Sequence, residues 1–273
     1  MEIRPDPDAD QDADQDADQH RAEDERRRTS WSAAEVAVRY DRGRPGYPAA
    51  AVEFALAPLR GRPDLRAADV AAGTGKLTSE LCAAGVNTVA VEPAPGMLKV
   101  LRHRVSRAQV LAGRAEDLPL PDASVDLVAV GQAFHWFDLD RALPELARVL
   151  RPGGRLALFY NSRDDSVAWV RALADLVGDH ADHAGAHRAE SPEPMGPFLP
   201  EAYERFRYEQ ELDADGLADL VGSRSYVITL PGDDRAVLLD RVRELARTHP
   251  MLVGRQHFFM PYVSTVQRYR LCP

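Results

Sequence analysis

The sequence predicts an α/β fold whose sheet is open, doubly wound and mostly parallel. Between residues 66 and 160, short apolar segments rich in valine, leucine and alanine alternate with segments of helical periodicity. Turn signals separate them, among them Gly85 and the Arg151-Pro152-Gly153-Gly154 run. Consecutive strands joined by helices run parallel with right-handed crossovers, so a ligand is expected at the carboxyl edge of the sheet.

Each element follows from its local pattern. Trp31, Val36 and Tyr40 stand at helical spacing and predict a first helix, before a turn-rich segment at 42–48 and a short helix over 49–59. The alternation then predicts strands over 66–71, 88–92, 109–112, 125–130 and 155–160, with helices over 76–84, 95–105 and 138–150 between them. After a helix and an irregular excursion within 163–200, the pattern indicates a strand over 203–210, helices over 213–223 and 234–248, and a final strand over 257–271.

The composition indicates a globular protein of the cytoplasm. The 273 residues are 45% hydrophobic, which is normal for a folded domain. No run of about 18 apolar residues is present, and the N-terminus lacks the cationic and apolar regions of a secretory signal. Cys82 and Cys272, the two cysteines, form neither a CxxC pair nor a disulfide framework. We therefore expect no membrane partner and reduced thiols.

The charge is concentrated in an N-terminal tail. Residues 8–19 repeat Asp-Ala-Asp-Gln, and residues 1–30 hold eleven acidic and five basic residues of a chain whose net charge is −9. We expect residues 1–29 to be a disordered acidic tail. The nearly neutral remainder argues against a nucleic-acid partner and favours a small-molecule substrate. We expect it to be one domain over 30–273, with a cofactor-binding core at about 40–161 and substrate-cap and C-terminal strands in 162–273.

The stretch from Ala68 to Thr78 is a strand that leads into a glycine loop and a helix. A phosphate-binding P-loop is disfavoured, because Val70 replaces its first glycine and Leu77 its hydroxyl residue. A dinucleotide fingerprint also fails, since Ala71 and Lys76 stand at two of its three glycine positions.

What remains is an acidic residue followed by Gly-x-Gly. Asp69 stands at the strand end, and Gly73 and Gly75 allow close approach of a ligand that has no phosphate in the loop. This pattern suits S-adenosylmethionine.

The motif resembles the first motif of the class I S-adenosylmethionine-dependent methyltransferases, and the resemblance spans roughly residues 40–161. It implies a Rossmann-like seven-stranded sheet with an antiparallel last strand, and S-adenosylmethionine as the cofactor, bound by Asp69, Gly73, Thr74 and Gly75. Ala71 stands where the family usually has a glycine, which is tolerable if its φ is negative.

Glu92, seventeen residues after Gly75, ends the second predicted strand. A carboxylate there accepts hydrogen bonds from both ribose hydroxyls, and in the family this position does so; the alternative is a charge at the N-terminus of the next helix. The resemblance also places Pro93 at the cofactor and Met97 against the adenine.

The segment 113–126 looks like the adenine-side loop of the family. Ala115 and Glu116 match positions that contact adenine. Arg114 stands where the family often has an aspartate one place earlier, so the side chain that reads the exocyclic amine is left open.

Aromatic residues gather after the fourth predicted strand, in the run from Gln132 to Phe137. This run resembles a segment of small-molecule methyltransferases of the trans-aconitate methyltransferase type, and Gln132 is expected at the cofactor. His135 is a candidate general base or a wall residue. Trp136 either faces the sulfonium through a cation–π contact or belongs to the core.

Upstream, the segment 40–48 resembles the family segment that closes over the methionine moiety, with Tyr40 as the contact. Arg42 and Arg44 either hold the methionine carboxylate or an acidic substrate, or are exposed loop charges. His180, His183 and His187 share a helical face in a polar segment without cysteine, so we expect a solvated face and no metal.

These observations predict methyl transfer from S-adenosylmethionine to a small organic molecule, such as a carboxylate or a secondary metabolite. Two alternatives are an enzyme that uses the bound sulfonium for non-methylating chemistry and a non-catalytic cofactor-binding module.

Overall fold

A single seven-stranded sheet runs through the molecule in the computed structural model, which describes residues 34–178 and 192–272. Its strand order is β3-β2-β1-β4-β5-β7-β6. The strands are β1 (Arg66–Val70), β2 (Asn87–Glu92), β3 (Gln109–Ala112), β4 (Val125–Gly131), β5 (Leu150–Arg163), β6 (Phe198–Leu212) and β7 (Phe258–Leu271). Strands β1 to β5 pair in parallel, and β7 lies antiparallel between β5 and β6. The predicted fold class is confirmed.

Helices cover both faces of the parallel part. On one face, α3 (Ala49–Leu56) and its extension η1 (Ala57–Leu59) pack with α4 (Lys76–Ala83), and α5 (Pro95–Arg104) packs beside them through its own small cluster. On the other face, α6 (Leu139–Val149) buries its apolar side against β1, β4 and β5. Because β-strand residues alternate between faces, Ala68 and Val70 join the α6 side while Ala67 joins the α3 side.

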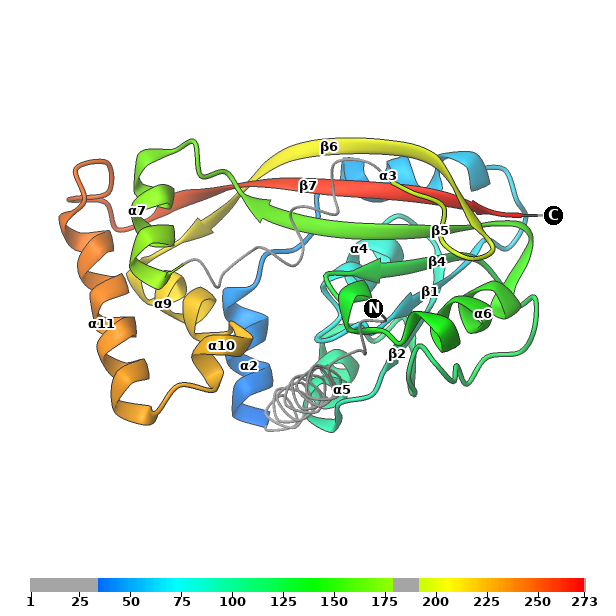
Figure 1. The fold of residues 1–273 in the computed structure, drawn as a ribbon, viewed down its shortest axis with the longest axis horizontal. Helices are drawn as coiled ribbons and strands as arrows, with labels where there is room; N and C mark the ends of the chain where they lie inside the picture. The colour runs from blue at the N-terminus through cyan, green and yellow to red at the C-terminus, as the bar shows by residue number, and fades with distance from the viewer. Residues whose placement is uncertain (1–33, 179–191, 273) are drawn as a thin grey trace, which may run out of the picture.

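The three long strands β5, β6 and β7 extend beyond the parallel part and carry a helical lobe (Figure 1). The lobe contains α7 (Ala168–Val177), α9 (Ala214–Gly222), α10 (Ser225–Ile228) and α11 (Gly232–Thr248), and these enclose a second hydrophobic core around Trp169 and Leu217. The first helix, α2 (Ala34–Gly43), contacts both α9 of the lobe and α5 of the parallel part. The sheet is thus continuous, whereas the hydrophobic core is divided.

The main difference from the predicted elements lies in β5. The sequence predicts a turn at 151–154 and a strand over 155–160, but the structure begins the strand at Leu150 and ends it at Arg163. Leu150 already pairs with Val125, and an irregularity in the register follows before the regular pairing resumes at Arg155. Gly153, with φ of 72°, allows the backbone to bend within the strand, so the predicted turn becomes an irregularity of β5.

Residues 1–33, 179–191 and 273 lie outside the described residues, and with them the predicted acidic tail and the predicted face of three histidines. In the part of the chain that the structure describes, no helix combines the length and hydrophobicity needed to span a membrane.

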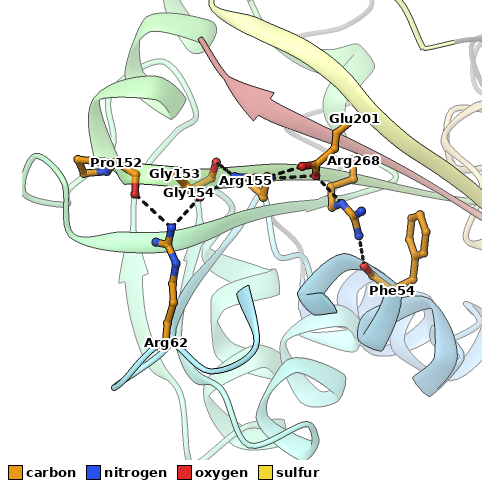
Figure 2. Close-up of polar contacts among 8 residues, drawn as sticks. All are labelled: Phe54, Arg62, Pro152, Gly153, Gly154, Arg155, Glu201 and Arg268. Carbon is orange, nitrogen blue, oxygen red and sulfur yellow. Dashed lines mark hydrogen bonds and ion pairs between the residues drawn. The ribbon is translucent and has the colours of Figure 1, made fainter. Parts of the chain in front are cut away.

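A network of arginines ties together the sheet edge opposite the glycine loop (Figure 2). Glu201 on β6 accepts hydrogen bonds from Arg155 on β5 (2.7 and 2.9 Å) and from Arg268 on β7 (2.7 Å). Arg268 also donates to the carbonyl of Phe54 in α3, at 2.5 Å. Although burial by itself raises it, the hydrogen bonds from the two arginines hold the pKa of Glu201 below its ordinary value.

Replacing Glu201 by Gln is therefore expected to lower the free energy of unfolding at pH 7 by about 1–3 kcal/mol, because two partly buried guanidiniums lose their charged partner. The pKa is depressed in the folded state, so this contribution is present above pH 4.5 and is lost as the pH falls through the folded-state pKa. Urea unfolding at pH 7 and near pH 3 measures the difference. The matched control is Glu204→Gln, an exposed position on the same strand that has no ion pair with the described residues. Equal effects of the two substitutions would contradict the assignment.

Candidate functional site

A pocket opens at the carboxyl ends of β1, β4 and β5, where the doubly wound sheet predicts it. Six of the residues singled out in the sequence line it: Tyr40, Arg44, Asp69, Gly73, Thr74 and Gln132. Arg224, between α9 and α10 of the helical lobe, and Tyr262, on β7 where the long strands carry the lobe, also line it. The pocket therefore lies where the two parts of the molecule meet.

The glycine loop packs closely against α5. Gly75 has φ of 84°, and a Cβ at this position would lie 2.4 Å from the side chain of Leu101 in α5. Gly73 has φ of 57°, and a Cβ there would meet only the ring of Tyr40, at 4.0 Å. Gly75 is thus required by the fold, whereas Gly73 leaves open space beneath Tyr40.

Ala71 does not have the negative φ that would make an alanine tolerable at this position of the loop. Its φ is 57°, in the left-handed region, where a Cβ costs about 1–2 kcal/mol. Gln132, after β4, has φ of 58° and faces the same pocket. Non-glycine residues held in this region often cluster at functional sites, since the surrounding structure must stabilise them.

Asp69 is the buried acid of the pocket. Its side chain is 1% exposed, and Oδ2 accepts a hydrogen bond of 2.5 Å from the hydroxyl of Thr78. Burial raises the pKa of Asp69 to about 7, against the opposing effect of the Thr78 hydrogen bonds. Its Oδ1 is buried without a hydrogen-bond partner among the described residues.

Glu92 does not line this pocket but supports the glycine loop beside it. Its Oε2 accepts from the backbone N–H of Gly73 and its Oε1 from that of Ala94, both at 2.8 Å. Each carboxylate oxygen retains a second lone-pair direction. Met97 is buried at 2% exposure, whereas Pro93 is exposed.

Ala115 and Glu116 follow β3, two strands from the pocket, and are likewise not among its lining residues. Ala115 is buried in the core that faces α6. Glu116 accepts a hydrogen bond from the backbone N–H of Asp138 at 3.1 Å, which ties this loop to the start of α6. That Ala115 and Glu116 contact adenine stays a prediction.

The segment that follows α2 is held over the pocket by side chains of the sheet. The carbonyl of Gly46 accepts hydrogen bonds from Asn161 Nδ2 (2.9 Å) and from the Tyr208 hydroxyl (3.0 Å). Gln210 donates to the carbonyl of Gly43 at 3.0 Å. These three contacts fix the backbone between Gly43 and Gly46.

Arg42 and Arg44 point in different directions. Arg44 lines the pocket, with its guanidinium 5.1 Å from the ring centre of Tyr40 and its Nε donating to Ser223 Oγ at 3.0 Å. Arg42 lies 3.5 Å from Asp219 on α9, and its side chain is 69% exposed. Arg42 is therefore not among the residues that line the pocket, which favours the alternative of an exposed charge. A role of Arg42 with a substrate stays a prediction.

His135 and Trp136 lie on η2 (Phe134–Trp136), directly after Gln132, but neither is among the residues that line the pocket. Their rings pack against each other with centres 4.8 Å apart. This arrangement favours a packing role behind the pocket over direct chemistry.

Sequence reasoning missed several pocket residues, above all Asn161 near the end of β5. Its backbone carbonyl accepts from Gln132 Nε2 at 2.8 Å, and its Oδ1 is buried without a partner among the described residues. Thr74 Oγ1 is in the same condition. Asp69, Thr74 and Asn161 thus all line the pocket, and each has a buried polar atom without a hydrogen-bond partner among the described residues, which is costly unless a ligand supplies one.

Comparison with known proteins decides what kind of ligand this is. Residues 68–158 match the family model of a methyltransferase domain. An uncharacterized methyltransferase of Mycobacterium tuberculosis is 45% identical over 243 residues, covering 89% of this chain and 97% of that protein. The chain belongs to the class I S-adenosylmethionine-dependent methyltransferases.

Two further proteins are similar to this methyltransferase. A structure assigned to a type II methyltransferase from Anaeromyxobacter dehalogenans has a TM-score of 0.64 at 26% identity, covering 84% of this chain and 99% of that one. A malonyl-[acyl-carrier protein] O-methyltransferase of Methylococcus capsulatus is 43% identical over 141 residues, which is 49% of this chain and 51% of that protein.

The pocket of the methyltransferase fits its cofactor, S-adenosylmethionine, which supplies a methyl group on a positively charged sulfur. The unsatisfied Oδ1 of Asp69 is complementary to the α-ammonium of the methionine part, and Arg44 to its carboxylate. The backbone N–H groups of Ala72, Gly73 and Gly75 already donate to Val91 O, Glu92 Oε2 and Ala72 O, so they do not form the row of donors around a phosphate that a nucleotide site requires. The assignment of each residue to a part of the cofactor is a prediction.

Proposed function

We propose that this methyltransferase methylates a small organic molecule, with the acceptor bound between the cofactor residues and the helical lobe. The observation that supports this is the position of the pocket: Asp69 and Thr74 lie on the glycine-loop side, and Arg224 and Tyr262 on the lobe side. Methyl transfer from a sulfonium needs alignment and exclusion of water more than covalent help. A pocket enclosed by a tethered segment and a helical lobe meets that need.

A carboxylate is one acceptor class in this proposal, and a secondary metabolite without a carboxylate is the other. Arg44 and Arg224 both line the pocket, and guanidiniums bind carboxylates through paired hydrogen bonds. The Methylococcus capsulatus relative is named for a malonyl group carried on acyl-carrier protein, and a malonyl group has a free carboxylate. The run from Gln132 to Phe137 also resembles small-molecule methyltransferases of the trans-aconitate type.

The test is a panel of acidic and neutral metabolites, each incubated with the protein and methyl-labelled S-adenosylmethionine. We expect release of S-adenosylhomocysteine together with label in an organic product. Label transfer that occurs only to protein or nucleic acid would contradict the proposal. Acceptor-dependent chemistry without label transfer would favour a non-methylating use of the sulfonium.

His135→Gln, assayed with the acceptor that the panel identifies, is expected to lower kcat by less than tenfold and to raise the acceptor KM. The reason is that His135 packs on Trp136 and is not among the residues that line the pocket. A general base contributes typically 10²–10⁴-fold, and its loss removes an acidic limb near neutrality from the pH profile. A loss in that range together with that limb would overturn the wall assignment.

A further inference from the structure

Asn161 lines the pocket, and one hydrogen bond from Nδ2 holds its side-chain amide in one orientation. Nδ2 donates to the carbonyl of Gly46 at 2.9 Å, which fixes the amide so that nitrogen and oxygen are not interchangeable. Gln132 Nε2 donates to the backbone carbonyl of Asn161 at 2.8 Å, which fixes the strand end. Oδ1 is buried and has no hydrogen-bond partner among the described residues, although Asn161 lines the pocket.

The strand order shows which part of the bound molecules Asn161 meets. Along the carboxyl edge, Glu92 ends β2, Asp69 lies near the end of β1, Gln132 follows β4, and Asn161 lies near the end of β5. Adjacent strands are about 4.8 Å apart, so Asn161 is roughly 10 Å along the edge from the acid of the glycine loop. Asp69, Glu92 and the glycine loop, which are assigned to the cofactor, belong to β1, β2 and the loops that follow them, and Gln132 at the end of the neighbouring β4 is also expected at the cofactor. Asn161 lies one strand further along the edge, which favours the acceptor side of the transferred methyl.

We propose that Asn161 is a specificity-determining residue that positions the methyl acceptor, by accepting a hydrogen bond at Oδ1 from an O–H or N–H group at or beside the methylated atom. This inference rests on the proposed function. An amide oxygen accepts hydrogen bonds but carries no charge at neutral pH, so Asn161 selects for a donor without holding a proton. A hydroxyl-bearing or amine-bearing acceptor satisfies it, whereas an acceptor with no donor leaves a buried polar atom unpaired.

The experiment compares two cofactor analogues that need no knowledge of the acceptor. S-adenosylhomocysteine has a neutral thioether at the position of the reacting sulfur, whereas sinefungin has an amine-bearing carbon there and so presents N–H donors at the site of transfer. We expect calorimetry to show that wild-type protein prefers sinefungin, and that Asn161→Ala reduces the preference by about ten- to one-hundredfold, the range for a hydrogen bond to a charged donor. Affinity for S-adenosylhomocysteine should change far less.

Tyr208→Phe is the matched control, because the Tyr208 hydroxyl donates to the same Gly46 carbonyl and Tyr208 is not among the residues that line the pocket. It removes a tether of the closing segment while leaving Oδ1 of Asn161 in place. Asn161→Asp removes the other tether but keeps an acceptor oxygen, so it should retain the preference for sinefungin. Thermal melting identifies any variant that is unfolded, and the Asp variant then carries the comparison.

The outcomes separate the possibilities. An unchanged preference in Asn161→Ala, or an equal reduction in Tyr208→Phe, would overturn the inference, because the tether alone would explain the result. Failure of the wild-type protein to bind either analogue would instead overturn the assignment of the pocket to the cofactor, and this inference with it. Binding of both analogues with a preference that only Asn161→Ala abolishes supports the role of Asn161.

Discussion

Asp69→Asn is expected to stabilise the ligand-free methyltransferase at pH 8 and, at the same time, to weaken its affinity for S-adenosylmethionine. The pKa of Asp69 is raised by burial to about 7, from 3.8, so the folded state binds this proton more tightly than the unfolded state. Stability therefore falls as the pH rises between these two values and is level above them. Asn is neutral at every pH and still accepts a hydrogen bond from Thr78.

Unfolding of wild type and Asp69→Asn by urea across pH 4 to pH 8 measures the first effect. The difference in unfolding free energy between the two proteins should grow by about 2–4 kcal/mol between pH 4 and pH 7 and then stay constant. Titrations common to both proteins cancel in this difference. A difference that does not change with pH would mean that Asp69 is already ionised at pH 5 in the folded protein, and would contradict the assigned pKa.

The second effect concerns the cofactor. We propose that the charged Oδ1 of Asp69 holds the α-ammonium, so Asp69→Asn should weaken S-adenosylmethionine binding by about 1.5–3 kcal/mol, the range for hydrogen bonds between charged groups. In wild type the affinity should fall as the pH drops below 7, because protonation removes the charge that attracts the ammonium. Calorimetry at pH 6 and pH 8 tests both statements. If Asp69→Asn binds S-adenosylmethionine with the affinity of wild type, Asp69 does not hold the ammonium and has only a structural role.

The regular part of the fold was predictable because its signals are local. Strands β1 to β4 consist of short apolar runs that end at turns, and their observed bounds lie within one residue of the predicted ones. The length of β6 was not predictable from the sequence. Its residues alternate between half-buried and exposed and carry many charges, and one sequence alone does not distinguish this pattern from an irregular segment. The pairing with β7 across its whole length is what stabilises it.

The site divides in the same way. Asp69, Gly73 and Gln132 were found because they belong to short motifs at the ends of strands. Arg224 and Tyr262 come from segments more than ninety residues further along, and the β6–β7 extension brings them to the pocket. Asn161 has no motif at all.

The backbone conformation also determines where side chains of the same type lie, which the residue type alone does not predict. Arg42 and Arg44 carry the same side chain two positions apart, yet the end of α2 at Gly43 separates an ion pair with Asp219 from a place in the pocket. Ala71 adopts a left-handed φ because the loop requires it, although the residue type argues for a negative value.

Glu92→Ala is expected to weaken cofactor binding by about 1.5–3 kcal/mol if its carboxylate accepts the ribose hydroxyls, as we propose. The structure adds a competing cause, because Glu92 also accepts from the backbone N–H groups of Gly73 and Ala94, and their loss alone would loosen the glycine loop. A single affinity measurement cannot separate these causes. Two ligands that differ by one ribose hydroxyl separate these causes. A hydrogen bond between Glu92 and that hydroxyl is lost equally whether the residue or the hydroxyl is removed.

The cycle therefore measures S-adenosylhomocysteine and its 2′-deoxy analogue against wild type, Glu92→Gln and Glu92→Ala. Removing the hydroxyl should cost wild type about 1–2 kcal/mol and should cost Glu92→Ala almost nothing, since the partner is already absent. Glu92→Gln retains one acceptor oxygen and should fall between them. If the deoxy analogue loses as much affinity in Glu92→Ala as in wild type, the two effects are independent. Glu92 would then act only as the buried support that joins β2, the glycine loop and the start of α5.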